Sequence, residues 1–480
     1  MESQQKKFKL FDAVLMSVVV VMVVESVAPA AAIGPSQFFW WALLLILFFV
    51  PYGLISSELG TTYAGDGGLY YWVRRAFGPR WGARLAWIYW INYPFWMAGL
   101  AVLFTQVGQR IFGWHLGTGG AIIGELLFIW IVVLVGNQPI SESKWILNLA
   151  ALTKIVIILS LGILGIYVAL TKGVANTFNW HTMLPQANLG SLSNLSVIIF
   201  NFLGFEVITT MADSMDNPQK QIRQAIVYGG LLSAVFYLLA AFGMGVAIPT
   251  TKLSASSGLL DGFVLLVGKL NWFVVLIGIC FMYTLISEMI SWALGINYVA
   301  DHAGQDHALP TIFAKEDRQG MPIGTGYLNG LIASVAVMTA PLFPNPDVFW
   351  SFFSLNVVAL LLSYALLFPA FWQLRRRDAQ KPRPFKVPGG RLLINLMTWV
   401  PEALLLIAIL FSILPTSLHH AAMVARAPLW IGISLTLIIG ELVVRVTERH
   451  RLASPTIHVY IFKPHRGVLV RSAKQPTRFY

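Results

Sequence analysis

The stretch LSVIIFNFLGFEVITTMADSMDNPQKQIRQAI, residues 195–226, decides the fold because it begins as an apolar membrane segment and is interrupted in its middle. Gly204 weakens a helix and Glu206 carries a charge that lipid does not tolerate, so both should face protein or water. One interpretation is a glycine kink with a protonated Glu206 that joins helices. We favour the other, a broken helix that lines a substrate cavity.

The composition around this stretch is that of a polytopic membrane protein. The chain has 480 residues, of which 57% are hydrophobic and 11% charged, and its mean hydropathy is +0.70. These values exclude a soluble enzyme. The single cysteine, Cys280, excludes a disulfide within the chain and a thiolate metal site. The net charge of +12 would suggest nucleic-acid binding in a soluble domain, so its meaning depends on the loops that carry it.

Twelve apolar runs can each cross a hydrocarbon core, which needs about 20 residues, with tilt or a break adjusting the shorter and longer runs. Each is predicted to be a membrane-spanning helix, so the predicted fold class is all-α. The runs cover residues 11–24, 38–55, 85–107, 121–135, 145–170, 195–211, 226–248, 272–299, 327–343, 348–372, 392–414 and 428–444.

The distribution of Lys and Arg predicts the orientation of these twelve spans. Of the 33 such residues, the segments on the side of the N-terminus carry 27, the opposite loops carry 5, and Lys154 lies within the fifth span. Positively charged loops stay inside, so both termini are expected in the cytoplasm. Orientation and attraction to anionic lipid in the bilayer then explain the net charge, and nucleic acid is excluded as a partner.

The first and sixth spans are the interrupted ones. They lie five spans apart, and an odd number reverses direction, so spans one to five and six to ten can form two inverted repeats whose broken helices meet at mid-membrane. Spans eleven and twelve fall outside the repeat and are expected to serve as scaffold or as contact in a homodimer. The predicted divisions are a cytoplasmic N-terminus, a transport core, a basic loop, spans eleven and twelve, and a basic tail, at residues 1–10, 11–372, 373–391, 392–444 and 445–480.

Three motifs resemble the amino acid–polyamine–organocation transporter superfamily. They are SELGTTYAGDGGLYYWVRRAFGPRWG at residues 57–82, FLGFE at 202–206 followed by DNPQKQIRQAI, and RRRDAQKPRPFKVPGG at 375–390. SEMISWALGINYVADHAGQDHALPTIF, at 287–313, is most similar to the glutamate/GABA antiporter branch, although the polyamine-uptake branch also has an acidic residue there. The first helix departs from the usual Gly-Ser-Gly-like element. This departure leaves open which backbone groups hold a substrate carboxylate.

The resemblance implies a secondary carrier with the five-plus-five fold in the inner or plasma membrane. Such a carrier exchanges amino acids or related amines by alternating access, without a cofactor or nucleotide hydrolysis. The alternative within transport is a proton-coupled importer of polyamines or cationic amino acids. The alternative of another class is a membrane sensor or scaffold that keeps the fold without transporting.

The two breaks are the predicted substrate site, because an amino acid brings a carboxylate and an ammonium that must both be satisfied after leaving water. Backbone N–H groups at the start of a half-helix suit the carboxylate, while unwound carbonyls and acidic side chains suit the ammonium. Phe200 and Phe202 are candidates for an aromatic gate, with core packing as the alternative. The candidate backbone sites are Val24, Glu25, Ser26, Val27 and Ala28 in the first span, and Asn201, Phe202, Gly204 and Phe205 in the sixth.

Three acidic residues, Glu25, Glu206 and Glu288, are expected to border the central cavity. Three carboxylates there would repel one another, so at least one is expected to hold a proton near neutral pH. The site would then be proton-linked or charge-selecting; for Glu25 and Glu288 the alternative is a hydrogen bond between helices. An acidic cavity favours a cationic amine, but a protonated Glu can also bind a carboxylate, so both substrates remain open.

Lys154 lies about 14 Å along the fifth helix, too deep to reach the interface easily. The resemblance implies that its ammonium replaces a sodium ion, which argues against sodium coupling; the alternative is a structural ion pair with a glutamate. Trp350 is a candidate gate residue or an interface anchor. His450, His458 and His465 could make the tail pH-sensitive, with a simply lipid-attracted tail as the alternative.

Overall fold

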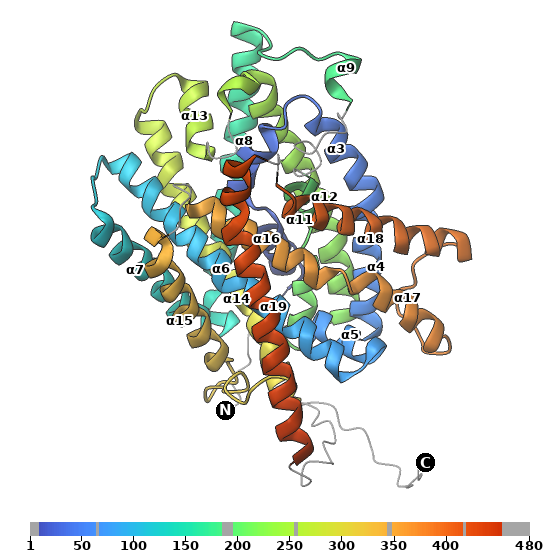
Figure 1. Cartoon of the computed structure of the whole chain (residues 1–480). Helices are drawn as coiled ribbons and strands as arrows, with labels where there is room; N and C mark the ends of the chain where they lie inside the picture. Colours follow the sequence, from blue (N-terminus) through green and yellow to red (C-terminus); the bar gives the residue numbers. More distant parts are fainter. Residues whose placement is uncertain are drawn as a thin grey trace.

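The computed structural model describes residues 9–63, 67–184, 195–253, 258–342, 348–415 and 419–453. Within these ranges the regular structure is entirely helical, which confirms the predicted fold class. The helices pack side by side in one bundle, with α13 near one end and the C-terminal part of α19 at the other (Figure 1). The tail carrying His458 and His465 lies outside the described residues, while His450 is in the last turn of α19 (His420–Ala453).

The first five crossings alternate in direction through the bundle. Gly78, at φ +95°, ends the short connecting helix α5 (Gly68–Phe77), and Pro79 then starts the third crossing at a position where no backbone N–H is needed. The elements are α1 (Leu10–Val21), η1 (Val24–Ser26) and α2 (Val27–Ala31); α3 (Gln37–Leu44), η2 (Leu45–Phe49) and α4 (Val50–Thr62); α6 (Pro79–Phe112); α7 (Thr118–Gly136); and α8 (Ile140–Lys172).

The remaining seven crossings begin with the interrupted stretch. They are α11 (Leu195–Phe200) with η3 (Phe205–Ser214), α12 (Pro218–Ala247), α14 (Trp272–Gln305), α15 (Ile323–Thr339) with η5 (Ala340–Leu342), α16 (Val348–Tyr364) with α17 (Leu367–Arg377), α18 (Arg391–Ile413) and α19. The connections contain α9 (Trp180–Met183), η4 (Thr250–Lys252) and α13 (Leu259–Val267). Among the described residues, ten helices are long and apolar enough to span a membrane. The long α6 and the shorter Leu195–Thr209 segment complete the twelve predicted crossings.

Both predicted breaks are present. Helix α1 ends at Val21, Met22 and Val23 leave the helical conformation, and the chain resumes as η1 and α2. Helix α11 ends at Phe200, and Gly204 at φ +104° lies between it and η3. The inverted repeat and the division of the chain into core and scaffold stay predictions.

We expect Gly204→Ala to destabilise the fold by about 1–3 kcal/mol, because its backbone conformation disfavours any residue with a Cβ. An added Cβ would also lie 2.8 Å from the Trp292 ring and 3.0 Å from Val20. Thermal unfolding of the detergent-purified protein measures this loss. The matched control is Gly119→Ala, whose Cβ would meet nothing within 4 Å. Equal unfolding temperatures for the two variants would contradict the expectation.

Candidate functional site

The two breaks face each other in the interior. The Ser26 hydroxyl lies 2.6 Å from Asn201 Oδ1 and 2.7 Å from the Val23 carbonyl oxygen. It therefore joins the break in the first span to the break in the sixth span. The close approach of Gly204 to Val20 brings the same two segments together. Two interruptions that are far apart in the sequence therefore form one irregular layer, as predicted from the Glu and Gly positions.

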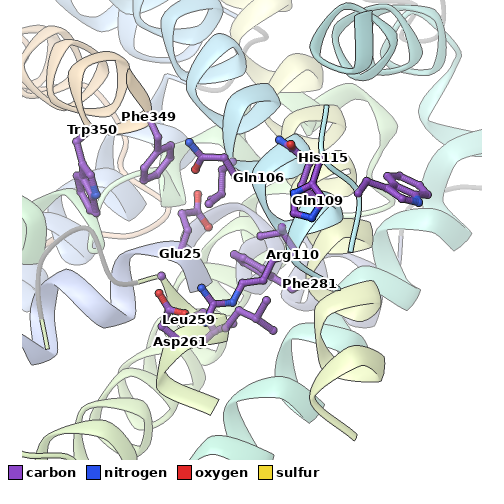
Figure 2. Close-up of a pocket in the computed structure, with 15 residues that line it drawn as sticks. Glu25, Gln106, Gln109, Arg110, His115, Leu259, Asp261, Phe281, Phe349 and Trp350 are labelled. Carbon is purple, nitrogen blue, oxygen red and sulfur yellow. Dashed lines mark ion pairs between the residues drawn. The ribbon is translucent and has the colours of Figure 1, made fainter. Parts of the chain in front are cut away.

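A cavity of about 430 Å³ lies next to this layer and is lined by Glu25 and by the start of α13. Helix α13 lies near one end of the bundle (Figure 1). This volume is within the range of small-molecule sites. Figure 2 shows the Glu25 carboxylate pointing into the cavity, with Gln106 and Phe349 on one side and Arg110 and Asp261 on the other. The lining residues are Glu25, Leu103, Gln106, Val107, Gln109, Arg110, Trp114, His115, Gly258, Leu259, Leu260, Asp261, Phe281, Phe349 and Trp350.

Glu25 is the acidic group at the inner part of this cavity. Its side chain is 3% exposed, and neither carboxylate oxygen has a hydrogen-bond partner among the described residues. The Lys154 ammonium and the Trp96 indole N–H act on it electrostatically, and neither forms a hydrogen bond with it. Because a buried carboxylate without a partner is costly, the site is completed by a cationic group or a proton.

Lys154 binds the broken end of α1. Its buried ammonium donates to the carbonyl oxygens of Val19 at 2.7 Å and Met22 at 2.6 Å, and it lies 2.9 Å from Glu288 Oε2. The last carbonyls of a helix lack intrahelical partners and carry partial negative charge, so a cation there is favourable. The alternative reading, an ion pair with a glutamate, is therefore present together with the capping contact.

Glu206 lies within a cluster of three tyrosines that the sequence reasoning missed. Tyr89 donates to one carboxylate oxygen at 2.9 Å, and Tyr52 and Tyr364 also donate to the carboxylate. The Tyr52 hydroxyl in turn accepts from the Gly204 N–H at 3.2 Å. Single tyrosines inside apolar runs were the available signal, because a buried tyrosine hydroxyl usually finds a polar partner.

Aromatic rings fill the space around the breaks. Phe200 packs edge-on against Trp96 at 5.5 Å and Phe353 at 5.3 Å between ring centroids. Phe202 contacts Trp41 and Phe49 instead of the cavity. These contacts are those of core packing in this conformation, and the gate role of the two phenylalanines stays a prediction.

Ion pairs join the helices at the opposite end of the bundle. Buried Glu58 accepts from Arg375 at 2.5 Å, from Arg383 at 2.8 Å and from the Val387 N–H at 2.6 Å. Nearby Asp378 binds Arg75 and Tyr63. Burial acts to raise the pKa of Asp378, but these hydrogen bonds hold it below its ordinary value. The described structure therefore has its cavity at the α13 end and ion pairs between helices at the α17 end.

Of the predicted substrate residues, Glu25 lines the cavity, and the gate candidate Trp350 lines it as well. Asp261 and His115 in the connecting segments, and the two glutamines near the end of α6, gave no signal in the sequence, because only the fold brings them to the cavity. The other predicted residues are buried around the two breaks, and their binding roles stay predictions: Val24, Ser26, Val27, Ala28, Phe200, Asn201, Phe202, Gly204, Phe205 and Glu288.

Comparison with known proteins agrees with this architecture. A family model described as amino acid permease matches residues 8–439. The chain belongs to the amino acid permease family. The predicted superfamily is thereby confirmed, and this permease is a multi-pass membrane transporter of amino acids or related amines rather than an enzyme.

Three transporters are similar in sequence to this permease over most of its length. It is 48% identical to the "Probable agmatine/putrescine antiporter AguD" of Lactococcus lactis subsp. lactis over 95% of this chain and 98% of the relative. It is 23% identical to the glutamate/gamma-aminobutyrate antiporter of the same organism over 77% and 76% of the two chains. It is 27% identical to the "Probable polyamine transporter At1g31830" of Arabidopsis thaliana over 75% and 69%. The relatives of this permease thus include proteins named as amine carriers and proteins named as amino acid carriers. The most extensive of these three similarities is to a protein named as a probable amine antiporter.

Proposed function

We propose that this permease exchanges agmatine for putrescine, with Glu25 as the ligand of a substrate cation. The observation that carries the proposal is the buried Glu25 carboxylate, which faces the cavity and has no hydrogen-bond partner among the described residues. A charge-assisted contact with an ammonium or guanidinium satisfies such a carboxylate. The 48% identity to a protein named as an agmatine/putrescine antiporter supports the same substrates.

Alternating access in this scheme uses the layer formed by the two breaks. A cation enters from the α13 end and pairs with Glu25, which neutralises the charge at the inner part of the cavity. Polar atoms of the two breaks that lack a hydrogen-bond partner among the described residues, such as Asn201 Nδ2, complete the site as the aromatic rings close over the substrate. Opening to the other side then requires separation of Glu58 from Arg375 and Arg383 at the α17 end.

The orientation belongs to this proposal. The last turn of α17, the loop after it and the first residue of α18 carry the Arg-rich segment 375–391, which lies at the end opposite the cavity. The positive-inside rule places that end in the cytoplasm, so the cavity opens outward across the inner or plasma membrane. Substrate from outside therefore reaches Glu25 first in this conformation.

Counterflow in liposomes tests the function. Purified permease is reconstituted in vesicles preloaded with agmatine, and labelled putrescine, arginine, glutamate or gamma-aminobutyrate is supplied outside. We expect rapid putrescine uptake that requires agmatine inside. Uptake into empty vesicles driven by an imposed proton gradient would identify a proton-coupled importer instead, and no flux of any substrate would favour a sensor or scaffold.

An amino acid as one exchange partner is the second candidate. Asn201 has an Nδ2 donor without a partner among the described residues, and it lies at the break opposite Ser26. An amide donor can bind a substrate carboxylate. The same panel decides the question, because uptake of labelled arginine or glutamate at a rate similar to putrescine would support this candidate over diamine exchange.

Exchange is expected to be independent of sodium. We propose that the Lys154 ammonium takes the place of a sodium ion, because it binds two carbonyl oxygens at the end of α1 and one carboxylate. Replacing external and internal sodium with choline should leave the initial putrescine rate unchanged. A rate that rises with sodium concentration at constant ionic strength would contradict this role for Lys154.

A further inference from the structure

Arg110 and Asp261 form an ion pair in the cavity lining, where both side chains are more exposed than Glu25. Arg110 is in the last turn of α6, and Asp261 is in the first turn of α13. The guanidinium Nη2 lies 2.6 Å from Asp261 Oδ1, and both side chains line the same cavity as Glu25 (Figure 2). The cavity thus contains two carboxylates, and the protein supplies a close cation to the outer one.

The contact between Arg110 and Asp261 is weak enough for a ligand to replace Arg110. The side chains of Arg110 and Asp261 are 49% and 33% exposed, and ion pairs with this exposure stabilise proteins only weakly. The contact also lacks hydrogen-bond geometry, so Asp261 Oδ1 has no hydrogen-bond partner among the described residues. A ligand that offers a well-aligned N–H donor can therefore displace Arg110 at small cost.

We propose that Asp261 is a mouth subsite for the second cationic group of a diamine-type substrate, and that Arg110 occupies this subsite in the empty carrier. The inference rests on the proposed function, because only a substrate with two cations needs a second carboxylate. One cation pairs with Glu25, the other pairs with Asp261, and Arg110 turns toward solvent. Agmatine carries the same guanidinium group as Arg110. The Asp261 carboxylate can therefore bind the Arg110 guanidinium in the empty carrier and the agmatine guanidinium in the loaded one.

The charges of the cavity lining agree with the replacement of Arg110 by a substrate cation at Asp261. Glu25 and Asp261 are the acidic residues of the lining, Arg110 is its permanent cation, and it also contains His115; Gln106 and Gln109 are neutral. With Arg110 paired, one carboxylate is left for an arriving cation. When Arg110 leaves, two carboxylates match a dication.

Opposite effects of two single variants test the subsite. The external KM for putrescine and for agmatine is measured in cells that express the permease and are preloaded with agmatine. Asp261→Asn should raise this KM by about fivefold because a partly exposed charge contact is lost, whereas Arg110→Gln should lower it by about twofold because a competing cation is removed. The double variant should resemble Asp261→Asn, because Arg110 acts through Asp261.

A pair that only joins α6 to α13 gives a different pattern. Both single variants would then raise the KM, or both would leave it unchanged, and either result overturns the subsite. The monoamine 1-aminobutane is a second readout, since its KM should respond to Asp261→Asn much less than the KM of putrescine does. If Asp261→Asn does not reach the membrane, Arg110→Gln decides: a fall in KM supports the subsite and a rise refutes it.

This test is separable from the proposed function. Wild-type permease that exchanges no amine overturns the proposed function and the subsite together. A different outcome removes only the subsite. In it the wild type exchanges amines, Glu25→Gln abolishes exchange, and Asp261→Asn and Arg110→Gln change the KM equally; the proposed function then stands.

Discussion

Glu25→Gln is expected to lower putrescine exchange by about 100-fold while the protein remains folded. The substitution keeps the size of the side chain and removes the negative charge that faces the cavity. Loss of one partner from a desolvated charge pair costs about 2–5 kcal/mol, and 1.4 kcal/mol corresponds to a factor of ten. Initial rates of counterflow at a fixed putrescine concentration measure the effect.

Glu402→Gln is the matched control for this experiment. Glu402 is also a buried carboxylate, and one of its oxygens lacks a hydrogen-bond partner within the described part of the chain, but it belongs to α18 and does not line the cavity. Its exchange rate should stay within about twofold of the wild type. Equal losses in the two variants would mean that any buried carboxylate is needed for folding. Glu25 would then not be the ligand of the substrate cation.

Lys154→Met is expected to cost about 3–5 kcal/mol of stability and to abolish exchange, because it leaves the buried Glu288 carboxylate without its cation. The variant also releases the Val19 and Met22 carbonyls that end α1. Thermal unfolding in detergent, followed by tryptophan fluorescence, measures the loss. The double variant Lys154→Met/Glu288→Gln should recover most of the unfolding temperature, since the uncompensated charge is removed.

The single variant Glu288→Gln completes this comparison. Lys154 keeps its two carbonyl partners there, so the loss should be smaller than that of Lys154→Met. Strictly additive effects of the two substitutions would show that the two side chains do not interact, against the 2.9 Å contact. Recovery of stability without recovery of exchange would place the Lys154 ammonium in the transport cycle as well as in the fold.

The helices and their breaks could be predicted because membrane physics leaves few choices. Apolar runs of sufficient length must form spanning helices, and a Gly-Phe-Glu or Val-Glu-Ser sequence inside such a run must be compensated by protein. The structure breaks the first span between Val21 and Val24 and the sixth around Gly204. The sequence pattern and the geometry therefore agree where lipid penalises an unsatisfied polar group.

Side-chain partners within the site could not be predicted in the same way. The rotation of a helix decides whether a carboxylate meets the cavity, as Glu25 does, or a lysine, as Glu288 does. The tyrosines around Glu206 come from three different helices, so no local pattern connects them. Asp261 reaches the cavity only because α13 packs against α14 and α8, which places Asp261 beside Arg110.

An experimental structure of the permease with bound putrescine tests the central claim most directly. The account predicts an ammonium nitrogen within about 3 Å of a Glu25 carboxylate oxygen, in the cavity above the paired breaks of α1 and α11. Putrescine bound elsewhere in the bundle, with the Glu25 carboxylate making no contact with it, would contradict the account.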